Sequence, residues 1–176
     1  MILLGRLKMS PETNLKTFMT EKEYNLCVDN FGDSVFRFLI KNIKDSDSAK
    51  DILQDTFTKL WEKKSDVDFF KAKSYIFTTA YHTMINNIRY DSQKDGLTGT
   101  QSFEKNGYND INEVLNRALE RLPEVQKAAI LLRDYEGYAY KEIGEILSLT
   151  QEQVKIYIFR ARVKLKEYIG SIDNII

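Results

Sequence analysis

The sequence predicts an all-α protein that consists of two small helical domains joined by a flexible linker, with a helix-turn-helix in the second domain. Apolar residues recur at helical spacing in both halves of the chain, which is typical of helices that bury one face. Between the halves the sequence loses this periodicity and is rich in Gly, Ser, Thr and Asn, as linkers are. We therefore expect an N-terminal arm (residues 1–18), a first domain (19–90), the linker (91–111) and a second domain (112–176).

The composition limits the class of protein. Hydrophobic residues make up 43% of the 176 residues, which is enough for two small cores. Lys and Arg number 26, and Asp and Glu also number 26. A net charge of zero argues against nonspecific coating of nucleic acid, because such binding depends on neutralising phosphates. Any contact with DNA should therefore be local or assisted by a partner.

Several features predict a cytoplasmic protein without catalytic chemistry. The single cysteine, Cys27, excludes an internal disulfide and lies in an apolar helical stretch, where a buried and unreactive thiol is expected. The apolar run in residues 1–9 is too short for a signal peptide, and no later run reaches the length of a membrane span. With one histidine, His82, and no glycine-rich phosphate loop, we expect no metal, no cofactor and no enzymatic activity.

Residues 21–44 are predicted to be helical, as one kinked helix or as two helices, because Gly32 interrupts the pattern. The turn at residues 44–48 offers Asp47 or Ser48 as the N-cap of the next helix. The apolar face of the first stretch contains Val28, Phe31, Val35, Leu39 and Ile43.

The next helix, predicted over residues 49–63, has an apolar inner face and an acidic outer face. The outer face carries Asp51, Gln54, Asp55, Thr58 and Glu62. Carboxylates at helical spacing also occur in the metal sites of helical bundles, but those sites use histidine ligands as well, and the only histidine is distant in sequence. The spacing alone leaves two interpretations open, a solvated face and a docking surface.

Residues 74–90 are predicted to form a helix whose polar side suits unpaired bases. The preceding loop, residues 64–73, carries Phe69 and Phe70, which are either core anchors or exposed stacking surfaces. The polar side of the helix is neutral, aromatic and hydrogen-bonding, and this composition favours exposed bases over the phosphates of duplex DNA. It carries Tyr75, Thr78, His82, Asn86 and Arg89.

The second domain ends in a predicted helix-turn-helix. Pro123 marks the start of a helix and Gly137 its end. A short helix follows at residues 140–147, and Gly144 in its middle indicates that another backbone passes close by. Thr150 is predicted to cap the last helix, which begins at residue 151. A short helix, a brief turn and a basic second helix are typical of motifs that enter the major groove. The exposed face of the last helix carries Gln151, Gln153, Lys155, Tyr157, Arg160 and Arg162.

Two parts of the chain resemble the bacterial sigma-seventy family of RNA polymerase sigma factors, in its extracytoplasmic-function group. The fourth conserved region of the family, which recognises the minus-thirty-five promoter element, is similar to LPEVQKAAILLRDYEGYAYKEIGEIL followed by TQEQVKIYIFRARVKLKEYI. The core-binding helix of the second conserved region, which docks on the clamp coiled coil of the polymerase's largest subunit, is similar to DILQDTFTKLW. The resemblance implies a sigma factor that directs core polymerase to promoter DNA, aids strand opening and is held inactive by an anti-sigma factor.

The resemblance also implies roles for individual residues. The positions expected to bind core polymerase are Asp51, Gln54, Asp55, Leu60 and Trp61. Those expected to contact the minus-ten element are Phe69, Phe70, Tyr75, Thr78, His82, Asn86 and Arg89. Those expected to contact the minus-thirty-five element are Lys141, Gln151, Gln153, Lys155, Tyr157, Arg160 and Arg162.

The second domain departs from the family pattern in three places. Ile156 and Tyr157 stand where a small polar residue and an arginine usually follow the lysine that corresponds to Lys155. A tyrosine cannot make a bidentate contact to guanine, so the promoter sequence does not follow by analogy. Ser148 replaces a common glycine, which predicts mild backbone strain. Ala139 replaces a hydroxyl cap of the short helix, at a cost of about 1 kcal/mol.

The alternative function is that of a stand-alone helix-turn-helix transcriptional regulator, whose first domain would sense a signal or form dimers. Tight promoter binding without polymerase would favour this alternative. The neutral net charge and the face suited to open strands instead predict weak binding of duplex DNA by the chain alone. A hydrolase or metal enzyme is a third class with almost no support in the residues.

Overall fold

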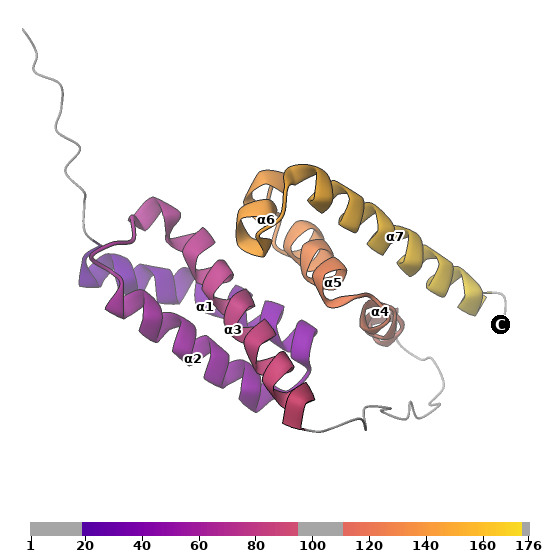
Figure 1. Cartoon of the computed structure of the whole chain (residues 1–176), viewed down its shortest axis with the longest axis horizontal. Coiled ribbons are helices and arrows are strands. Elements are labelled where there is room, and N and C mark those ends of the chain that lie inside the picture. The colour runs from indigo at the N-terminus through magenta and orange to yellow at the C-terminus, as the bar shows by residue number, and fades with distance from the viewer. Residues whose placement is uncertain (1–18, 95–110, 174–176) are drawn as a thin grey trace, which may run out of the picture.

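The structure, a computed structural model, describes residues 19–94 and 111–173 (Figure 1). The predicted N-terminal arm and most of the predicted linker lie outside these residues. Within them the chain is helical, without strands, and divides into two helical groups as predicted. No helix in these two ranges is long and apolar enough to cross a membrane.

The first domain is a bundle of α1 (Glu21–Ile43), α2 (Ser46–Glu62) and α3 (Ala72–Lys94), and each helix packs against the other two (Figure 1). A short 3-10 turn, η1 (Phe69–Lys71), leads into α3. Each helix contributes fully buried apolar side chains, such as Leu39, Ile52 and Ile76, from the predicted faces, but Val28, which was predicted on the apolar face of α1, is exposed. Cys27 is also buried, and burial raises the pKa of its thiol, as expected for an unreactive cysteine.

α1 is one helix that continues through Gly32, so the interpretation as two helices is wrong. Its start is stabilised by a reciprocal cap, in which the Glu23 N–H donates to the Thr20 hydroxyl and the Thr20 N–H donates to the Glu23 carboxylate. Because the packed face of α1 is continuous on both sides of Gly32, burial outweighs the local preference of glycine to leave the helix.

The turn between α1 and α2 corrects a prediction. Lys44 ends α1 in the left-handed conformation, with φ 62°. Asp45 is then the N-cap of α2, where its carboxylate accepts a hydrogen bond from the Ser48 N–H at 3.0 Å. The predicted caps, Asp47 and Ser48, both lie inside the helix. The error arises because several residues of this run can cap a helix, and the left-handed turn selects among them.

The second domain contains α4 (Ile111–Glu120), α5 (Glu124–Ile130), α6 (Tyr140–Leu147) and α7 (Gln151–Asp173). α5 continues into a π-helical turn, η2 (Leu131–Tyr135), which the periodicity does not predict. The chain then passes Gly137 at φ 74°, in the conformation expected at a helix end. α7 packs on α4, α5 and α6 through a stripe that includes Val154, Ile158 and Ala161.

The connection between α6 and α7 has the geometry of a helix-turn-helix. A Cβ on Gly144 would lie 2.7 Å from the carbonyl oxygen of Leu149, so the predicted close backbone approach is confirmed. Ser148 adopts the left-handed conformation with φ 57°, which confirms the predicted strain. Thr150 caps α7: its hydroxyl accepts from the Gln153 N–H, and its own N–H donates to the Gln153 side chain.

Replacing Gly144 with alanine should lower the free energy of unfolding by about 2 kcal/mol, because the new methyl group would overlap a backbone carbonyl that cannot move freely. Gly32→Ala is the matched control, since nothing lies within 4 Å of its added Cβ. That variant should gain roughly 0.5–1 kcal/mol from the better helix propensity of alanine. Urea denaturation followed by circular dichroism measures both, and equal effects of the two substitutions would contradict the close approach.

The two domains pack against each other in the structure. α3 contacts α6, α1 contacts α5, and the buried apolar residues of both domains form one continuous cluster. Figure 1 shows α6 lying beside the first half of α3. The sequence predicts two domains but contains no signal for this packing, because helical periodicity does not specify which helix a face will meet.

Candidate partner and nucleic-acid surfaces

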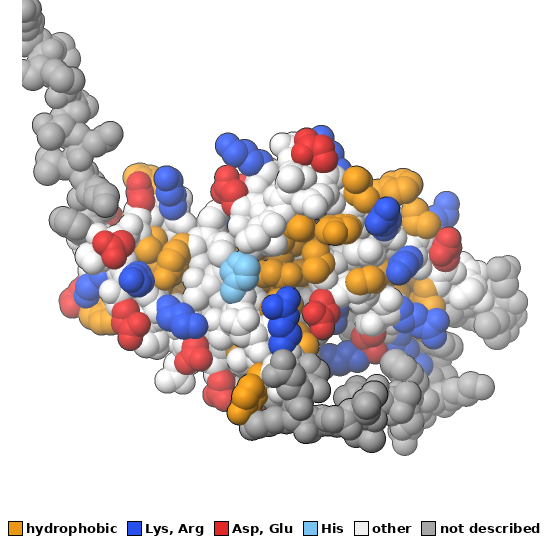
Figure 2. Space-filling model, viewed as in Figure 1, with side chains coloured by type: hydrophobic (Ala, Val, Ile, Leu, Met, Phe, Trp, Pro, Cys, Tyr) orange, Lys and Arg blue, Asp and Glu red, His pale blue; other side chains and the backbone are white. Residues whose placement is uncertain are grey.

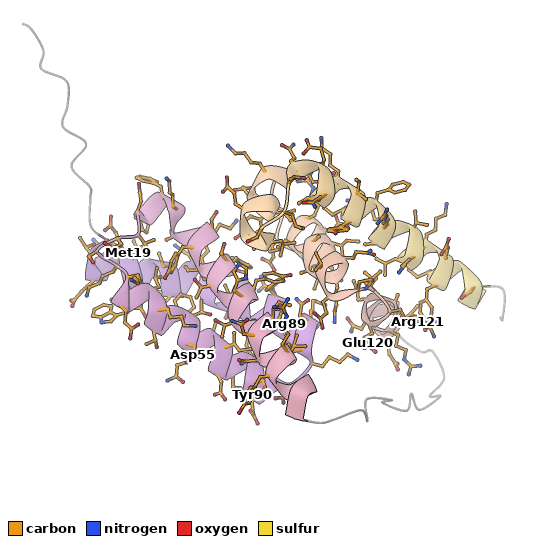
Figure 3. All side chains as sticks on the ribbon, in the orientation of Figure 1. Met19, Asp55, Arg89, Tyr90, Glu120 and Arg121 are labelled. Carbon is orange, nitrogen blue, oxygen red and sulfur yellow. The ribbon has the colours of Figure 1, made fainter. Side chains whose placement is uncertain are left out.

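The acidic face of α2 is exposed along its length. Asp51, Gln54 and Asp55 are all exposed, and Figure 3 shows Asp55 on the side of α2 that faces away from the other helices. Neither carboxylate forms an ion pair with a residue in the described ranges, whereas the nearby Asp47 pairs with Lys50 at 3.2 Å. The two carboxylates are therefore available to a cationic partner, with Gln54 as a neutral hydrogen-bonding group between them.

The two apolar positions of α2 differ sharply in exposure. Leu60 is fully buried, so it holds α2 in the bundle and presents no surface to a partner. Trp61 is 39% exposed and lies at the end of the acidic face. The Lys64 ammonium lies 3.1 Å from the centre of the Trp61 ring, and the Tyr24 ring meets it edge-on at 4.9 Å. The indole is therefore held in one orientation while part of it remains accessible.

The loop before α3 presents one phenylalanine and buries part of the other. Phe70 is 91% exposed, whereas Phe69 is half-buried and packs against the core. The two rings meet edge-on, with their centroids 5.8 Å apart. The Asp68 carboxylate accepts a hydrogen bond from the Phe70 N–H at 2.9 Å, which caps η1. An exposed ring on an ordered turn is suited to stack on an unpaired base.

The predicted polar side of α3 is present and extends along the helix that follows this loop. His82, Asn86 and Arg89 are exposed, and Tyr75 and Thr78 are half-buried. Arg89 and Tyr90 lie toward the end of α3, where the chain leaves the first domain (Figure 3). Phe70 and the polar side of α3 thus provide stacking and hydrogen-bonding groups in one domain.

The helix-turn-helix brings most of its predicted residues to the surface. Lys141 on α6 and three polar or basic residues of α7, Gln151, Lys155 and Arg160, are exposed. Gln153 is also exposed, although its side-chain oxygen accepts the capping hydrogen bond of Thr150 at 2.8 Å. The following set lines a shallow depression at the turn: Lys141, Gly144, Glu145, Ser148, Leu149, Thr150, Gln151 and Gln153.

Several apolar residues on α7 are exposed although they were not predicted as surface groups, and two of them lie among the predicted DNA-contact residues. Ile156 is 47% exposed and Phe159 is 68% exposed, and each is next to a cation in sequence, Lys155 before Ile156 and Arg160 after Phe159. Figure 2 shows orange side chains together with blue ones over this part of the molecule. The sequence signal that could have revealed their exposure was their position outside the buried stripe of α7. Apolar groups among cations on such a helix are suited to contact thymine methyl groups.

Tyr157 and Arg162 differ from the other predicted residues of α7. Tyr157 is half-buried against the core. The Arg162 guanidinium makes two contacts with Asp134 of η2, at 2.7 Å and 3.4 Å. These bonds raise the pKa of Arg162 and join α7 to the π-helical turn. Arg162 therefore has a partner inside the domain.

Replacing Arg162 with alanine should lower the free energy of unfolding by about 0.5 kcal/mol, since the pair is half-exposed and screened by water. Exchanging the charges, with Asp134→Arg and Arg162→Asp together, should restore most of this loss if the residue acts as an anchor. Denaturant unfolding measures the stability of each variant. A loss of promoter binding in the exchanged variant, with stability restored, would instead assign Arg162 to DNA contact.

A cleft of about 950 Å³ lies where the two domains meet, and it contains a buried amine. Its lining includes Lys127 of α5, which is 7% exposed, with the carboxylates of Asp45, Glu120 and Glu124. Burial lowers the pKa of Lys127 to about 8. No group of His, Cys, Asp and Glu residues in the described parts of the chain is arranged to hold a metal ion.

The comparisons with known proteins match both domains to one family. Residues 27–93 match sigma-70 region 2, and residues 112–165 match sigma-70 region 4. ECF RNA polymerase sigma factor SigM of Bacillus subtilis (strain 168) is 29% identical over 142 residues, which cover 76% of this chain and 87% of SigM. RNA polymerase sigma factor YlaC of the same strain is 28% identical over 145 residues, covering 76% of this chain and 84% of YlaC.

The solved structures show the same fold. Sigma factor RpoE of Bartonella quintana, crystallised in complex with the anti-sigma factor NepR, superposes with a TM-score of 0.73. The match covers 85% of this chain and 98% of RpoE, at 22% identity.

Proposed function

The chain belongs to the sigma-70 family of RNA polymerase sigma factors, in the extracytoplasmic-function group, and from this premise we propose which surface performs each step of initiation. The first domain binds core polymerase through the acidic face of α2 and holds the opened minus-ten element on α3. The second domain holds the minus-thirty-five element with α7. The protein acts in the cytoplasm as a non-enzymatic subunit, since initiation requires positioning of DNA and the polymerase carries the chemistry.

The docking step rests on the unpaired carboxylates of α2. Asp51 and Asp55 are exposed and lack ion-pair partners in the described ranges, so an arginine-bearing coiled coil can form charge-assisted hydrogen bonds with them without breaking bonds within the chain. Trp61, held by Tyr24 and Lys64, adds an apolar contact at the end of the same face. Leu60 supports this surface from within the core.

Strand opening is assigned to Phe70 and the polar side of α3. A base that leaves the duplex needs a stacking surface and hydrogen-bonding groups around it. Phe70 supplies the ring, and His82, Asn86 and Arg89, which lie farther along α3, supply exposed hydrogen-bonding groups for the rest of the opened strand. This composition explains why the domain is expected to favour unpaired strands over intact duplex.

Recognition of the upstream element is assigned to the first turns of α7. Lys155 and Arg160 bind phosphates or bases, Gln151 and Gln153 offer amides to base edges, and Ile156 and Phe159 contact methyl groups. An anti-sigma factor, of the kind that accompanies RpoE of Bartonella quintana, is a further proposed partner of this chain.

Run-off transcription tests the function. Core polymerase with the purified chain should start transcripts at specific sites on genomic fragments, whereas neither component should do so alone. The start sites then reveal the promoter sequence. Tight promoter binding by the chain alone, with no effect of the chain on core polymerase, would support the stand-alone regulator instead.

A further inference from the structure

The cleft between the two domains is lined by apolar side chains and by carboxylates. Its volume of about 950 Å³ is large enough for a small organic molecule. Tyr90, toward the end of α3, and Glu120, at the end of α4, line it from the two domains (Figure 3). Asp45 and Glu124 add two exposed carboxylates. The apolar residues of the lining are Ile43, Ile52, Met84, Ile88 and Leu122. None of the lining residues belongs to the surfaces assigned above to polymerase or DNA.

Lys127 brings an amine into this cleft. The residue lies on α5, lines the cleft and is 7% exposed. Its ammonium donates a hydrogen bond to the carbonyl oxygen of Asn42 at 3.1 Å, and this is its only hydrogen bond to the described residues. An ammonium has three N–H donors. Two of them therefore remain for water or for a molecule in the cleft.

The surroundings of Lys127 favour its neutral, nucleophilic form. Burial lowers the pKa of Lys127 to about 8, and the charges of Lys44 and Lys41 on α1 act in the same direction. The carboxylates of Glu120 and Glu124 act in the opposite direction. About a quarter of the amine is then neutral at pH 7.5, against roughly one part in a thousand for an ordinary lysine with a pKa of about 10.4. Lys127 can therefore attack an electrophile at neutral pH.

The charges and the lining of the cleft select a neutral, apolar aldehyde as the electrophile. Three carboxylates, those of Asp45, Glu120 and Glu124, repel anionic reagents such as acyl phosphates. Acylation would also leave a neutral amide where these carboxylates now face a cation. Condensation with an aldehyde keeps the positive charge, and an aliphatic chain gains stability when it is buried against the apolar lining.

We propose that the cleft is a binding and modification site for aliphatic aldehydes, in which Lys127 forms a Schiff base. The neutral amine attacks the carbonyl carbon, an N–C bond forms, and a proton moves from nitrogen to oxygen to give a carbinolamine. The C–O bond then breaks, and the hydroxyl leaves as water with the proton that the ammonium first released. The nitrogen lone pair forms the C=N bond of a protonated imine. The step keeps one positive charge and needs no oxidant or reductant. This inference does not depend on the proposed function.

Reductive trapping on the full chain tests the site. Octanal is the probe, and cyanoborohydride converts the imine into a stable secondary amine that peptide mapping by mass spectrometry locates. At pH 7.5 and low conversion, Lys127 should carry at least tenfold more label than Lys164 or Lys166, two exposed lysines of α7. The excess of neutral amine at Lys127 is larger than this, but nucleophilicity falls with basicity.

The pH dependence of the labelling provides a second readout. The ratio of the Lys127 label to the Lys164 label should stay constant below about pH 8, where the neutral fractions of both amines rise together. Above pH 8 the ratio should fall, because Lys127 is then mostly neutral while the surface amine continues to lose protons. The same peptide maps measure this ratio at each pH.

Two variants and a second probe separate the cleft from general reactivity. Lys127→Arg keeps the charge and can still donate to Asn42, but its guanidinium forms no imine, so the main octanal adduct should be lost. Ile88→Asn makes part of the lining polar and should lower octanal labelling of Lys127 several-fold. Val67→Asn, at another half-buried position outside the cleft, should leave it unchanged. Acetaldehyde, whose methyl group buries little surface, should label Lys127 equally in the native chain and in both asparagine variants.

Circular dichroism checks that each variant keeps its helices. A Lys127 label no stronger than the labels of Lys164 and Lys166 in the native chain would overturn the proposal, whatever the variants do. Equal octanal labelling in the native chain and in Ile88→Asn would also overturn it, because the apolar lining would then play no part. The preference of Lys127 for octanal over acetaldehyde, relative to the same preference at Lys164, gives this test without any substitution, and equal preferences would contradict the site.

Discussion

Replacing Asp51, Gln54 and Asp55 together with alanine should weaken binding of core polymerase by about a hundredfold or more. Each charge-assisted hydrogen bond contributes about 1.5–3 kcal/mol, and the variant removes two carboxylates and one amide from a single face. The three side chains are exposed, so the helical bundle should keep its stability. Pull-down of core polymerase and a titration by fluorescence anisotropy measure the weaker binding.

The matched control for this variant lies on α1. Asp29, Asn30 and Asp33 are also two acids and one amide on the surface of a helix, and their replacement with alanine makes the same change in net charge. This control should bind core polymerase like the native chain. If the α2 variant binds core polymerase as strongly as the native chain, the acidic face is not the docking surface. If both variants bind equally weakly, the effect is due to net charge.

Replacing Lys155 and Arg160 with alanine should weaken promoter binding by the assembled holoenzyme by roughly ten- to a hundredfold. Side chains of this kind contribute about 1–3 kcal/mol when they reach a base and make binding salt-dependent when they reach a phosphate. The slope of log affinity against log salt should therefore fall by about 1 for each phosphate that the variant no longer binds. Electrophoretic mobility shifts over a range of salt concentrations distinguish binding to bases from binding to phosphates.

Lys164→Ala with Lys166→Ala is the control, because both residues are exposed on the same helix but lie farther from the turn. Its effect should be small. Both variants should bind core polymerase as strongly as the native chain, because these residues and the acidic face of α2 lie in different domains. If the control weakened promoter binding as strongly as the test variant, the first turns of α7 would not be the reading surface.

The candidate surfaces were predictable where they depend on one helix. Spacing alone identifies the acidic face of α2 and the polar side of α3, and all the charged residues predicted there are exposed or partly exposed. Exposure of Phe70 and partial burial of Phe69 were not predictable, because both rings follow the same loop and only the packing of η1 separates them. Leu60 and Trp61 differ for the same reason, as one points into the bundle and its neighbour out of it.

The sequence by itself determined the helices, the helix-turn-helix and the family. Caps, apolar periodicity and the requirement for glycine at position 144 are local features, and they act within one helix or one turn. The tertiary structure decided which charged groups stay free and how the domains meet. Arg162 pairs with Asp134, and Lys127 bonds to the end of α1, because folding brings together residues that are 28 and 85 positions apart. Helical periodicity carries no information about such distant pairs, since it records which face is buried and not what buries it.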